Sequence, residues 1–539
     1  MATVSEVVIR TIRDSGIKYV FGVPSGAWVN YMKAINDTKG IEFVLVSNEA
    51  GGAIMADACW RLTGLPAACF GTYGPGACNV STGVVCAYLD RSAMLVFTDE
   101  MSDSMRDRTT QMNIDHQALF SPITKWTTRL KSDAVRATIQ KAVGLALSEV
   151  PGPVHVGLPV GMGDMAAASE SQTAFQARGP DKPEEKNLKR LAELFGRAAK
   201  PIFALGITAV RAKVRDLVLE VAEKFQVPIV LTPMAKGMVS ESHPSYAGVL
   251  AHALANHVGQ IHQTSDLVIG VGYDPAEINY EAWMPDVPLV SIDTVPADID
   301  EGRFTLACDV VGDIAYGLRR LLEINGKPKN WDMGEIAGIR NEMFDRLRMP
   351  DTAMLHSSAV LGILRDQLPE SGVMTCDVGA HLHLIGQLWE TPAPGLLLMT
   401  NGGSSMGYAI PSAISAKLCC SDREVACVVG DGGFLMMAGE LATATRLKAK
   451  VVFILLSDNS LSLIRIKQDR QWQFDYGTEL GKHATDIGPV LFGVPVITAA
   501  TIDEYREALK SAFSHDGPVM VKALVDTMYY DELLLKGNR

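Results

Sequence analysis

The chain has 539 residues, which is room for roughly three domains of about 150 residues each. Hydrophobic residues make up 47% and charged residues 20%, a composition typical of a globular protein with sizeable cores. A net charge of −12 without a basic stretch argues against binding to nucleic acid or to an acidic membrane surface.

The nine cysteines mostly lie in apolar runs, and their odd number and the lack of a CxxC pattern predict free thiols in a reducing compartment. The N-terminus has the pattern of a helix running into a strand, without the apolar core of a signal peptide. No apolar run reaches the roughly 18 residues that a membrane span needs. We therefore expect a cytoplasmic protein.

The first segment, residues 1–165, alternates short apolar strands with helices, which predicts a parallel α/β domain. Expected strands at 41–46, 67–70 and 93–98 are each followed by polar or glycine-rich residues. Three loops lie where strands are expected to end: FGVPSG at 21–26, SNE at 47–49 and TYGPGACN at 72–79.

The middle of the chain repeats this alternation between two linkers. Residues 165–186 are polar and of low complexity, which predicts a linker. Residues 187–327 carry the apolar runs PIFALGI, PIVLTP, DLVIGVG and PLVSID, with fewer polar groups at the strand ends, and we expect a scaffold domain. Residues 328–350 form a second, partly helical linker, and the tail from 526 carries no strong signal.

The last domain, residues 353–525, contains the most informative unit, a strand at 425–429, the turn GDGG at 430–433, a helix over 434–448 and a strand at 451–456. Right-handed crossovers bring the ends of both strands to one edge of a parallel sheet. Asp431 and Asn459 would then offer oxygens suited to Mg²⁺, and the glycines could approach a phosphate with bare N–H groups. The unit predicts a diphosphate–Mg²⁺ site, although a lone Gly-Asp-Gly is also a common turn.

Glu49 is the most informative isolated residue. It follows an apolar strand and precedes a helix made largely of Ala, Gly, Ile and Met, so we expect its carboxylate to be desolvated. A helix N-terminal acid favoured by the helix dipole is the simpler alternative for Glu49 taken alone.

Several motifs occur together and in a fixed order: VSNEAGGAIMADACWRLTG, TYGPGACN, QMNIDHQALFSPITKW, TCDVGAH, TNGGSSMGYAIP and the GDG…DN unit. In this order they resemble thiamine-diphosphate (ThDP) dependent 2-oxo-acid decarboxylases and carboligases, in particular the acetolactate-synthase-like branch, over essentially the whole chain. The resemblance implies a pyrimidine-binding domain at 1–165, a central domain at 187–327 and a diphosphate-binding domain at 353–525. It also implies a homodimer or homotetramer with the active site at the dimer interface.

The resemblance assigns roles to individual residues. Glu49 matches the glutamate that hydrogen-bonds the aminopyrimidine of ThDP, while Asp431, Asn459 and the backbone carbonyl near Leu461 match the Mg²⁺ ligands. Gln111 lies about one residue from the active-site glutamine of the family, and His116 is a further catalytic candidate. The other cofactor-binding candidates are Pro24, Gly76, Asn79, His381, Ser404, Met406, Gly430, Gly432 and Gly433.

The chain departs from the family pattern where substrate specificity is set. Tyr73 stands where a serine often precedes Gly-Pro-Gly, and IDHQALF places His116 and Gln117 near the mouth of the site. Arg465 falls where decarboxylases often carry a glutamate and acetolactate synthases an apolar residue; it could bind a second anionic group of the substrate or be a surface cation. The substrate candidates are Gly26, Tyr73, Gln117 and Arg465.

The stretch VGYDPAEINYEAW at 271–283 resembles the FAD-independent, catabolic type of acetolactate synthase, so no FAD is expected. The leading hypothesis is a ThDP- and Mg²⁺-dependent enzyme that decarboxylates a 2-oxo acid, pyruvate by family default, and transfers the acyl-anion unit to a second carbonyl. The alternatives are a decarboxylase that releases an aldehyde, with His116 as proton donor, and a non-catalytic subunit with this fold. A Rossmann NAD(P) enzyme lacks support because no GxGxxG follows a strand with an acid about 20 residues on.

Overall fold

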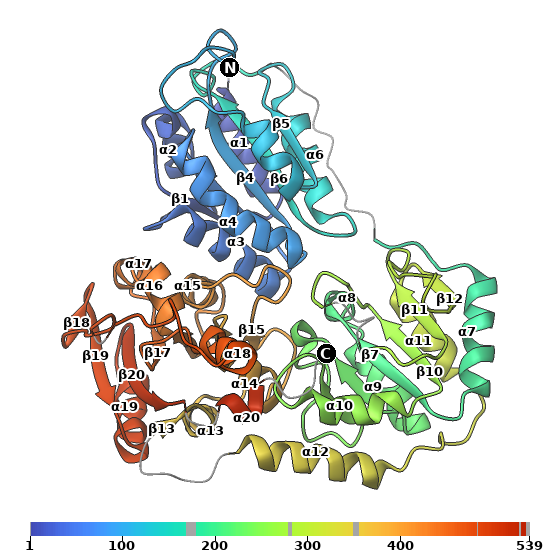
Figure 1. The fold of residues 1–539 in the computed structure, drawn as a ribbon. Coiled ribbons are helices and arrows are strands. Elements are labelled where there is room, and N and C mark those ends of the chain that lie inside the picture. Colours follow the sequence, from blue (N-terminus) through green and yellow to red (C-terminus); the bar gives the residue numbers. More distant parts are fainter. Residues whose placement is uncertain are drawn as a thin grey trace.

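The computed structural model describes residues 2–168, 179–278, 283–348, 355–481, 483–527 and 530–534. They form three sheets of mainly parallel strands, each flanked by helices, and Figure 1 shows the three units as separate groups in chain order. The predicted three-domain parallel α/β class is confirmed. Among the described residues, no helix is both long enough and apolar enough to cross a membrane.

The N-terminal sheet has six parallel strands in the order β2-β1-β3-β4-β6-β5. Strands β3, β4 and β6 are buried along their whole length, as expected for apolar runs with helices on both faces. Its strands are β1 (Tyr19–Gly22), β2 (Glu42–Leu45), β3 (Ala67–Gly71), β4 (Met94–Glu100), β5 (Trp126–Arg129) and β6 (Pro153–Pro159). Its helices are α1 (Val4–Asp14), α2 (Val29–Asn36), α3 (Glu49–Thr63), α4 (Pro75–Leu89), α5 (His116–Phe120) and α6 (Val135–Leu147).

The central sheet also has six parallel strands, in the order β12-β11-β10-β7-β8-β9. Its strands are β7 (Pro201–Leu205), β8 (Ile229–Leu231), β9 (Tyr246–Val249), β10 (Leu267–Val271), β11 (Leu289–Asp293) and β12 (Leu306–Val311). The helices of this part are α7 (Glu185–Arg197), α8 (Ile207–Arg211), α9 (Arg215–Phe225), α10 (Ala255–Gln263), α11 (Ile314–Leu322) and α12 (Met333–Leu347).

The C-terminal sheet has eight strands in the order β15-β14-β16-β17-β20-β19-β18, with β13 paired to β20 and only β18 antiparallel to its neighbour. Its strands are β13 (Leu355–His356), β14 (Val373–Cys376), β15 (Leu397–Leu398), β16 (Val425–Gly430), β17 (Val451–Ser457), β18 (Val490–Leu491), β19 (Val494–Ala499) and β20 (Val519–Asp526). Its helices are α13 (Ser357–Gln367), α14 (Ala380–Leu388), α15 (Ala409–Cys419), α16 (Asp431–Met437), α17 (Glu440–Leu447), α18 (Ser462–Trp472), α19 (Ile502–Ser514) and α20 (Tyr530–Leu534).

The predicted strands at 425–429 and 451–456 are confirmed as β16 and β17, which pair in parallel. The single helix predicted over 434–448 is wrong in one respect, because the segment forms two helices, α16 and α17, that break at residues 438–439. Gly439 is a poor helix former, and Glu440 just after it is held by contacts to the N-terminal domain.

The order of strands creates a switch point in the C-terminal sheet. From β14 the chain runs to β15 on one side, then returns to form β16 on the other side of β14. The carboxyl ends of β14 and β16 therefore diverge into a crevice, the place where open α/β sheets bind ligands. The N-terminal sheet has the same arrangement at β1 and β3, which lie side by side with β2 beyond β1.

A buried polar cluster joins the N-terminal and C-terminal domains beside the packed helices α3 and α15. Arg61 on α3 donates hydrogen bonds to the carbonyl of Met399 and to the hydroxyl of Tyr408, which donates to Asp57 at 2.8 Å. Asp90 accepts a hydrogen bond from Gly403 N at 3.0 Å. The loop from 399 to 408 is thus fixed against α3 and the end of α4.

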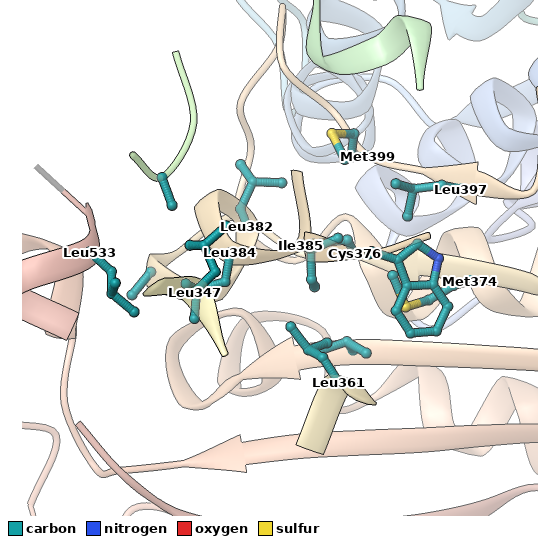
Figure 2. Packing of buried hydrophobic residues seen from close by; sticks show 14 of the residues in the cluster. Leu347, Leu361, Met374, Cys376, Leu382, Leu384, Ile385, Leu397, Met399 and Leu533 are labelled. Atoms are coloured by element: carbon teal, nitrogen blue, oxygen red, sulfur yellow. The ribbon is translucent and has the colours of Figure 1, made fainter. Parts of the chain in front are cut away.

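Helix α14 is anchored in the largest hydrophobic cluster, which spans the central and C-terminal domains. Figure 2 shows Leu382 and Leu384 of α14 near Leu533 and Leu347, and Ile385 facing the neighbouring strands. Helices α12, α13 and α20 all contact α14. This packing gives the start of α14 a fixed position at the crevice.

Parts of the predicted segments lie outside the described residues: 1 of the first domain, 169–178 of the first linker, 279–282 of the GYDP stretch, 349–350 of the second linker, 353–354 and 482 of the last domain, and 528–529 and 535–539 of the tail. The described part of the second linker forms α12.

Candidate active site

The carboxyl ends of β14, β16 and β17 border a cavity of about 150 Å³. Its lining comes from residues 378–381, 430–433, 458 and 460–464, together with Met406, Leu456, Val525 and Tyr530. The cavity therefore lies at the switch point of the C-terminal sheet.

Asp431 is the first residue of α16 and is buried against the end of β17. Its Oδ2 accepts hydrogen bonds from the backbone N–H groups of Asp458 at 2.8 Å and Asn459 at 2.6 Å. Its Oδ1 is buried and has no hydrogen-bond partner among the described residues. A buried carboxylate oxygen without a partner is costly, and a cation would satisfy it.

Asp458 lines the same cavity, directly after β17. Its carboxylate accepts hydrogen bonds from Ser460 N at 3.0 Å and from the hydroxyl of Ser462. Burial raises the pKa of Asp458 to about 6, and the nearby Asp431 adds to this rise. Two neighbouring carboxylates at one cavity form a donor set that suits Mg²⁺.

The oxygens of Asn459 and Leu461, the other expected metal ligands, accept hydrogen bonds, as both carboxylate oxygens of Asp458 do. Asn459 has a left-handed backbone with φ 55°, and its side-chain oxygen accepts a hydrogen bond from Thr485 at 3.3 Å. The carbonyl of Leu461 accepts from the backbone N–H groups of Ile464 and Arg465 as the first acceptor of α18, while its side chain lines the cavity. Asp458 and Ser460, which precede Asn459 and Leu461 by one position each, also line the cavity.

The glycines of the GDGG turn leave room that no other residue would leave. A Cβ at Gly432 would lie 2.5 Å from Met406 Cε and 2.6 Å from Leu461 Cδ2. A Cβ at Gly433 would overlap with the carboxylate of Asp377. Bare backbone at a helix start is what an anionic group such as a diphosphate needs for close approach.

His381 enters the cavity from the start of α14, next to Gly430. Burial lowers the pKa of His381 to about 4, so the imidazole is neutral at physiological pH. Its Nε2 is buried without a partner in the part of the chain that the structure describes. A neutral histidine with one free nitrogen can hydrogen-bond a bound ligand there.

Asp377 ties together the loops on both sides of the cavity. It accepts hydrogen bonds at 2.9 Å from the backbone N–H groups of Val378, Gly407 and Ala409. Burial raises the pKa of Asp377 to about 6 despite these donors. Met406 is thereby held at the cavity wall, whereas the Ser404 hydroxyl donates to the carbonyl of Asn401 at 2.6 Å.

Glu49 is the first residue of α3 in the N-terminal domain and is 9% exposed. Asn79 donates a hydrogen bond to Glu49 Oε2 at 3.1 Å, and the other carboxylate oxygen lies 3.3 Å from the Cβ position of Gly76. The structure thus brings Glu49, Gly76 and Asn79 together. None of them lines the cavity at Asp431 in the same chain.

The turn before Glu49 is fixed by a residue of the C-terminal domain. The carboxylate of Glu440 accepts the backbone N–H groups of Ser47 at 3.0 Å and Asn48 at 2.9 Å. Gly51 makes this approach possible, because a Cβ there would lie 2.7 Å from Glu440 Oε1. Glu440 opens α17, which follows the GDGG helix, and burial raises its pKa.

The two loops at the switch point of the N-terminal sheet are linked by Asp99 at the end of β4. Its carboxylate accepts hydrogen bonds from Ser25 at 2.5 Å and from Thr72 at 3.3 Å, and burial raises its pKa to about 6. The expected site residues of these loops are exposed Pro24 and Gly26 and half-buried Tyr73.

His116 and Gln117 are drawn inward from the mouth of the site. His116 is 2% exposed, and its ring nitrogens are hydrogen-bonded to Gly74 N and to Thr98. Burial lowers the pKa of His116 to about 4, so it holds no spare proton for a substrate. Gln117 donates to Glu100, and Gln111 is exposed.

Arg465 is not among the residues that line the cavity, whereas its neighbour Ile464 is. Its guanidinium donates to the Thr527 hydroxyl at 2.9 Å. Ile464 is 45% exposed at the cavity. On α18 the cavity is therefore lined by Ser462, Leu463 and Ile464, and not by Arg465.

The sequence predicted no role for Asp99, Asp377 or Glu440, and Asp458 entered only as part of the Asp-Asn pair after the strand. Asp99, Asp377 and Asp458 each follow an apolar strand, and that position was the available signal. Glu440 gave no comparable signal, since its partners lie about 390 positions earlier.

A second cavity, of about 120 Å³, lies at the carboxyl edge of the central sheet. It is lined by Tyr273, Asp274 and Asp293, and by Arg91, which forms an ion pair with Asp274. Burial raises the pKa of Asp293 to about 7.

Three family models match successive parts of the chain. Residues 2–119 match the N-terminal TPP binding domain of thiamine pyrophosphate enzymes, residues 188–321 the central domain and residues 377–523 the C-terminal TPP binding domain. Thiamine pyrophosphate (TPP) is another name for ThDP.

Similar proteins align over almost the full chain. The chain is 26% identical to an acetolactate synthase of Bacillus subtilis, over 99% of this chain and 95% of the relative. It is 27% identical to the catabolic acetolactate synthase of Raoultella terrigena, over 99% and 96%. It is 26% identical to the large subunit of acetolactate synthase isozyme 1 of Escherichia coli, over 97% and 94%.

Proposed function

Because the chain belongs to the thiamine pyrophosphate enzyme family, we propose that it decarboxylates a 2-oxo acid and transfers the remaining acyl unit to a second carbonyl, in an acetolactate-synthase-like reaction. The observation that carries this proposal is the cavity at the switch point, where Asp431 has a buried oxygen without a described partner beside Asp458 and a glycine turn.

The donor set fits Mg²⁺ and a diphosphate. Asp431 and Asp458, which both line the cavity, would hold the ion, while the metal roles expected for Asn459 and the Leu461 carbonyl from the motif stay predictions. Gly430, Gly432 and His381 would contact the diphosphate. When bound, ThDP supplies a nucleophilic carbon and the electron sink that decarboxylation needs.

The role of Glu49 is to hold a proton at the aminopyrimidine of the cofactor. Its position outside the cavity of its own chain supports a homodimer, or a homotetramer built from dimers, in which Glu49 of one chain serves the site of the other. The cofactor-side roles of Pro24, Gly76 and Asn79 belong to the same proposal.

The side chains of His116 and Ile464 favour ligation over aldehyde release. Release of an aldehyde needs a proton at the reacting carbon, and a positioned protein acid would speed its delivery. His116 is neutral and hydrogen-bonded on both nitrogens, and Ile464 is apolar. Neither position offers a proton.

The test is a substrate panel with the ThDP- and Mg²⁺-loaded protein. Pyruvate, longer 2-oxo acids and dianionic 2-oxo acids are each assayed for CO₂ release, and the products are analysed for a new C–C bond. We expect a ligated product from a monoanionic donor. Free aldehyde as the main product would overturn ligation, and a strict preference for dianionic donors would restore a substrate role for Arg465.

The same assay tests Glu49. Glu49→Gln should abolish most activity, whereas Glu42→Gln, an exposed glutamate of the preceding strand, should leave it unchanged. Full activity in Glu49→Gln would refute the assigned role. The nine free thiols agree with the proposed cytoplasmic location.

A further inference from the structure

Behind the glycine turn that begins at Gly74, buried polar side chains form one continuous chain of hydrogen bonds. The N–H of Gly74 donates to His116 Nε2 at 3.3 Å. The hydroxyl of Thr98 lies 2.8 Å from His116 Nδ1 and 2.8 Å from His155 Nε2, so it joins the two rings.

The chain of hydrogen bonds continues across the sheet from His155. Its Nδ1 lies 2.7 Å from the hydroxyl of Thr127, which donates to the side-chain oxygen of Gln117 at 2.8 Å. The amide of Gln117 donates to Glu100 at 2.5 Å, and Glu100 is paired with Arg129.

The two ends fix the direction of every bond between them. A backbone N–H can only donate and an ionised carboxylate can only accept. His116 must therefore accept at Nε2 and donate from Nδ1, and Thr98 must donate to His155, which donates from its own Nδ1 to Thr127. Burial lowers the pKa of both histidines, in agreement with neutral rings.

The same region could be read as a metal centre, because ligand atoms of Glu100, His116 and His155 lie within 4.8 Å of one another. The hydroxyl of Thr98 already joins the facing ring nitrogens, and Gln117 and Arg129 occupy Glu100. The hydrogen-bond chain accounts for these groups without an ion.

We propose that His116 is a positioning residue, which acts through this directional chain of hydrogen bonds to fix the amide of Gly74 and, with it, the turn beside Glu49. The role rests on the proposed function, since the turn matters for catalysis only if Glu49 serves the cofactor. His116 and Gln117 are thereby assigned to holding the site in shape, in place of contacting substrate.

The turn at Gly74 connects this hydrogen-bond chain to Glu49. Gly74 is the residue that caps α4, with φ 65°, and Gly76 and Asn79 in the first turns of α4 contact the Glu49 carboxylate. A Cβ at Gly74 would lie 2.8 Å from the Met112 carbonyl oxygen, so the segment that carries Gln111 packs closely against the same turn.

The first experiment reads the tautomers of the two rings by nuclear magnetic resonance of isotope-labelled histidine in the full chain. Among the 11 histidines, His116 and His155 are assigned by their loss in single variants. Both should carry one proton, on Nδ1, unchanged between about pH 5 and 8. A proton on Nε2 of either ring, a doubly protonated ring, or a shift of both signals on adding Zn²⁺ would overturn the proposal.

The second experiment compares Thr98→Val, which keeps the volume and removes the hydroxyl, with Thr98→Ser, which keeps the hydroxyl. The readout is the rate of hydrogen–deuterium exchange at C2 of bound ThDP, which needs no knowledge of the substrate. Thr98→Val removes the hydrogen bonds of the hydroxyl to both histidines and should slow exchange roughly tenfold or more, since one buried hydrogen bond is worth about 1 kcal/mol, while Thr98→Ser stays within about twofold of the native protein. Thr128→Val, one residue from Thr127 on β5, is the matched control.

A role in packing alone would reverse the order of the two Thr98 variants, because serine leaves a cavity and valine does not. That reversal, or equal rates in all three variants, would overturn the proposal. If the native protein binds no ThDP, the proposed function fails, whereas the tautomer experiment still tests the hydrogen-bond chain.

Discussion

The choice between Asp458 and Asn459 as a metal ligand can be decided by two neighbouring substitutions. Asp458→Ala removes a carboxylate that lines the cavity beside Asp431. Asn459→Gly is the matched change, because glycine accepts the left-handed backbone of that position and loses only the 3.3 Å hydrogen bond from Thr485.

The expected magnitudes differ for the free and the loaded protein. Without metal, the pKa rise of Asp458 from 3.8 to about 6 means that its charge costs about 3 kcal/mol near neutral pH. Asp458→Ala relieves this cost and loses two hydrogen bonds worth about 1 kcal/mol each, so the stability of the free protein should change little. With metal, the loss should exceed about 100-fold in Mg²⁺ affinity, because even partners of metal ligands contribute about 10- to 100-fold.

Calorimetric titration of Mg²⁺ into the ThDP-saturated protein measures the affinity, and thermal unfolding with and without both cofactors measures the linked stabilisation. Asn459→Gly should bind Mg²⁺ within about threefold of the native protein. The reasoning fails if Asn459→Gly loses Mg²⁺ binding while Asp458→Ala keeps it.

Three further predictions concern residues around the two switch points. Gly433→Ala should destabilise the protein more than Gly432→Ala. The new methyl group at 433 meets the anchored carboxylate of Asp377, whereas the one at 432 meets the flexible side-chain ends of Met406 and Leu461. Chemical unfolding should show free energies of unfolding that differ by about 1–3 kcal/mol between the two variants, and equal losses would contradict the contact geometry. Asp99 has a folded pKa of about 6, raised from 3.8 by burial, so its contribution to stability is full below about pH 4 and is lost, by about 3 kcal/mol, as pH rises through about 6. Urea unfolding at several pH values should find a flatter profile across that window in Asp99→Asn, and an unchanged slope would exclude Asp99 as its source. Arg61→Met should cost about 3–5 kcal/mol in thermal unfolding, because it strands the buried Asp57 and Asp90, and restoration by Asp90→Asn in the double variant is the check.

The elements around the GDGG turn could be predicted from the sequence because their signals are local. Apolar runs of strand length are bounded by glycines and polar residues. This pattern predicted β16, β17 and the position of Asp431 to within a residue or two. The parallel class followed from the repeated alternation of strands and helices.

Which side chains after β17 line the cavity could not be predicted in the same way. Asp458 and Asn459 both carry oxygens that suit Mg²⁺, and of the two only Asp458 lines the cavity, beside the left-handed backbone of Asn459. Further along the same segment, Ile464 lines the cavity, whereas Arg465 donates to Thr527.

Long-range partners were likewise beyond the sequence. Glu440 belongs to a helix in the sequence pattern, and its use as an acceptor for the turn before Glu49 depends on how two domains pack. His116 looks like a catalytic histidine until the strands place Thr98 and the Gly74 turn at its two nitrogens.

The hydrogen-bond chain behind Gly74 also has a consequence for how this protein can change over generations. Thr98, His155 and Thr127 each donate one hydrogen bond and accept another, so replacing any of them alone by a residue that cannot do both leaves an unpaired group on either side. Drift at one of these positions is therefore selected against unless its neighbours change in the same lineage. Descendants should inherit the set as a block or lose it as a block, with single intermediates that are rare and short-lived.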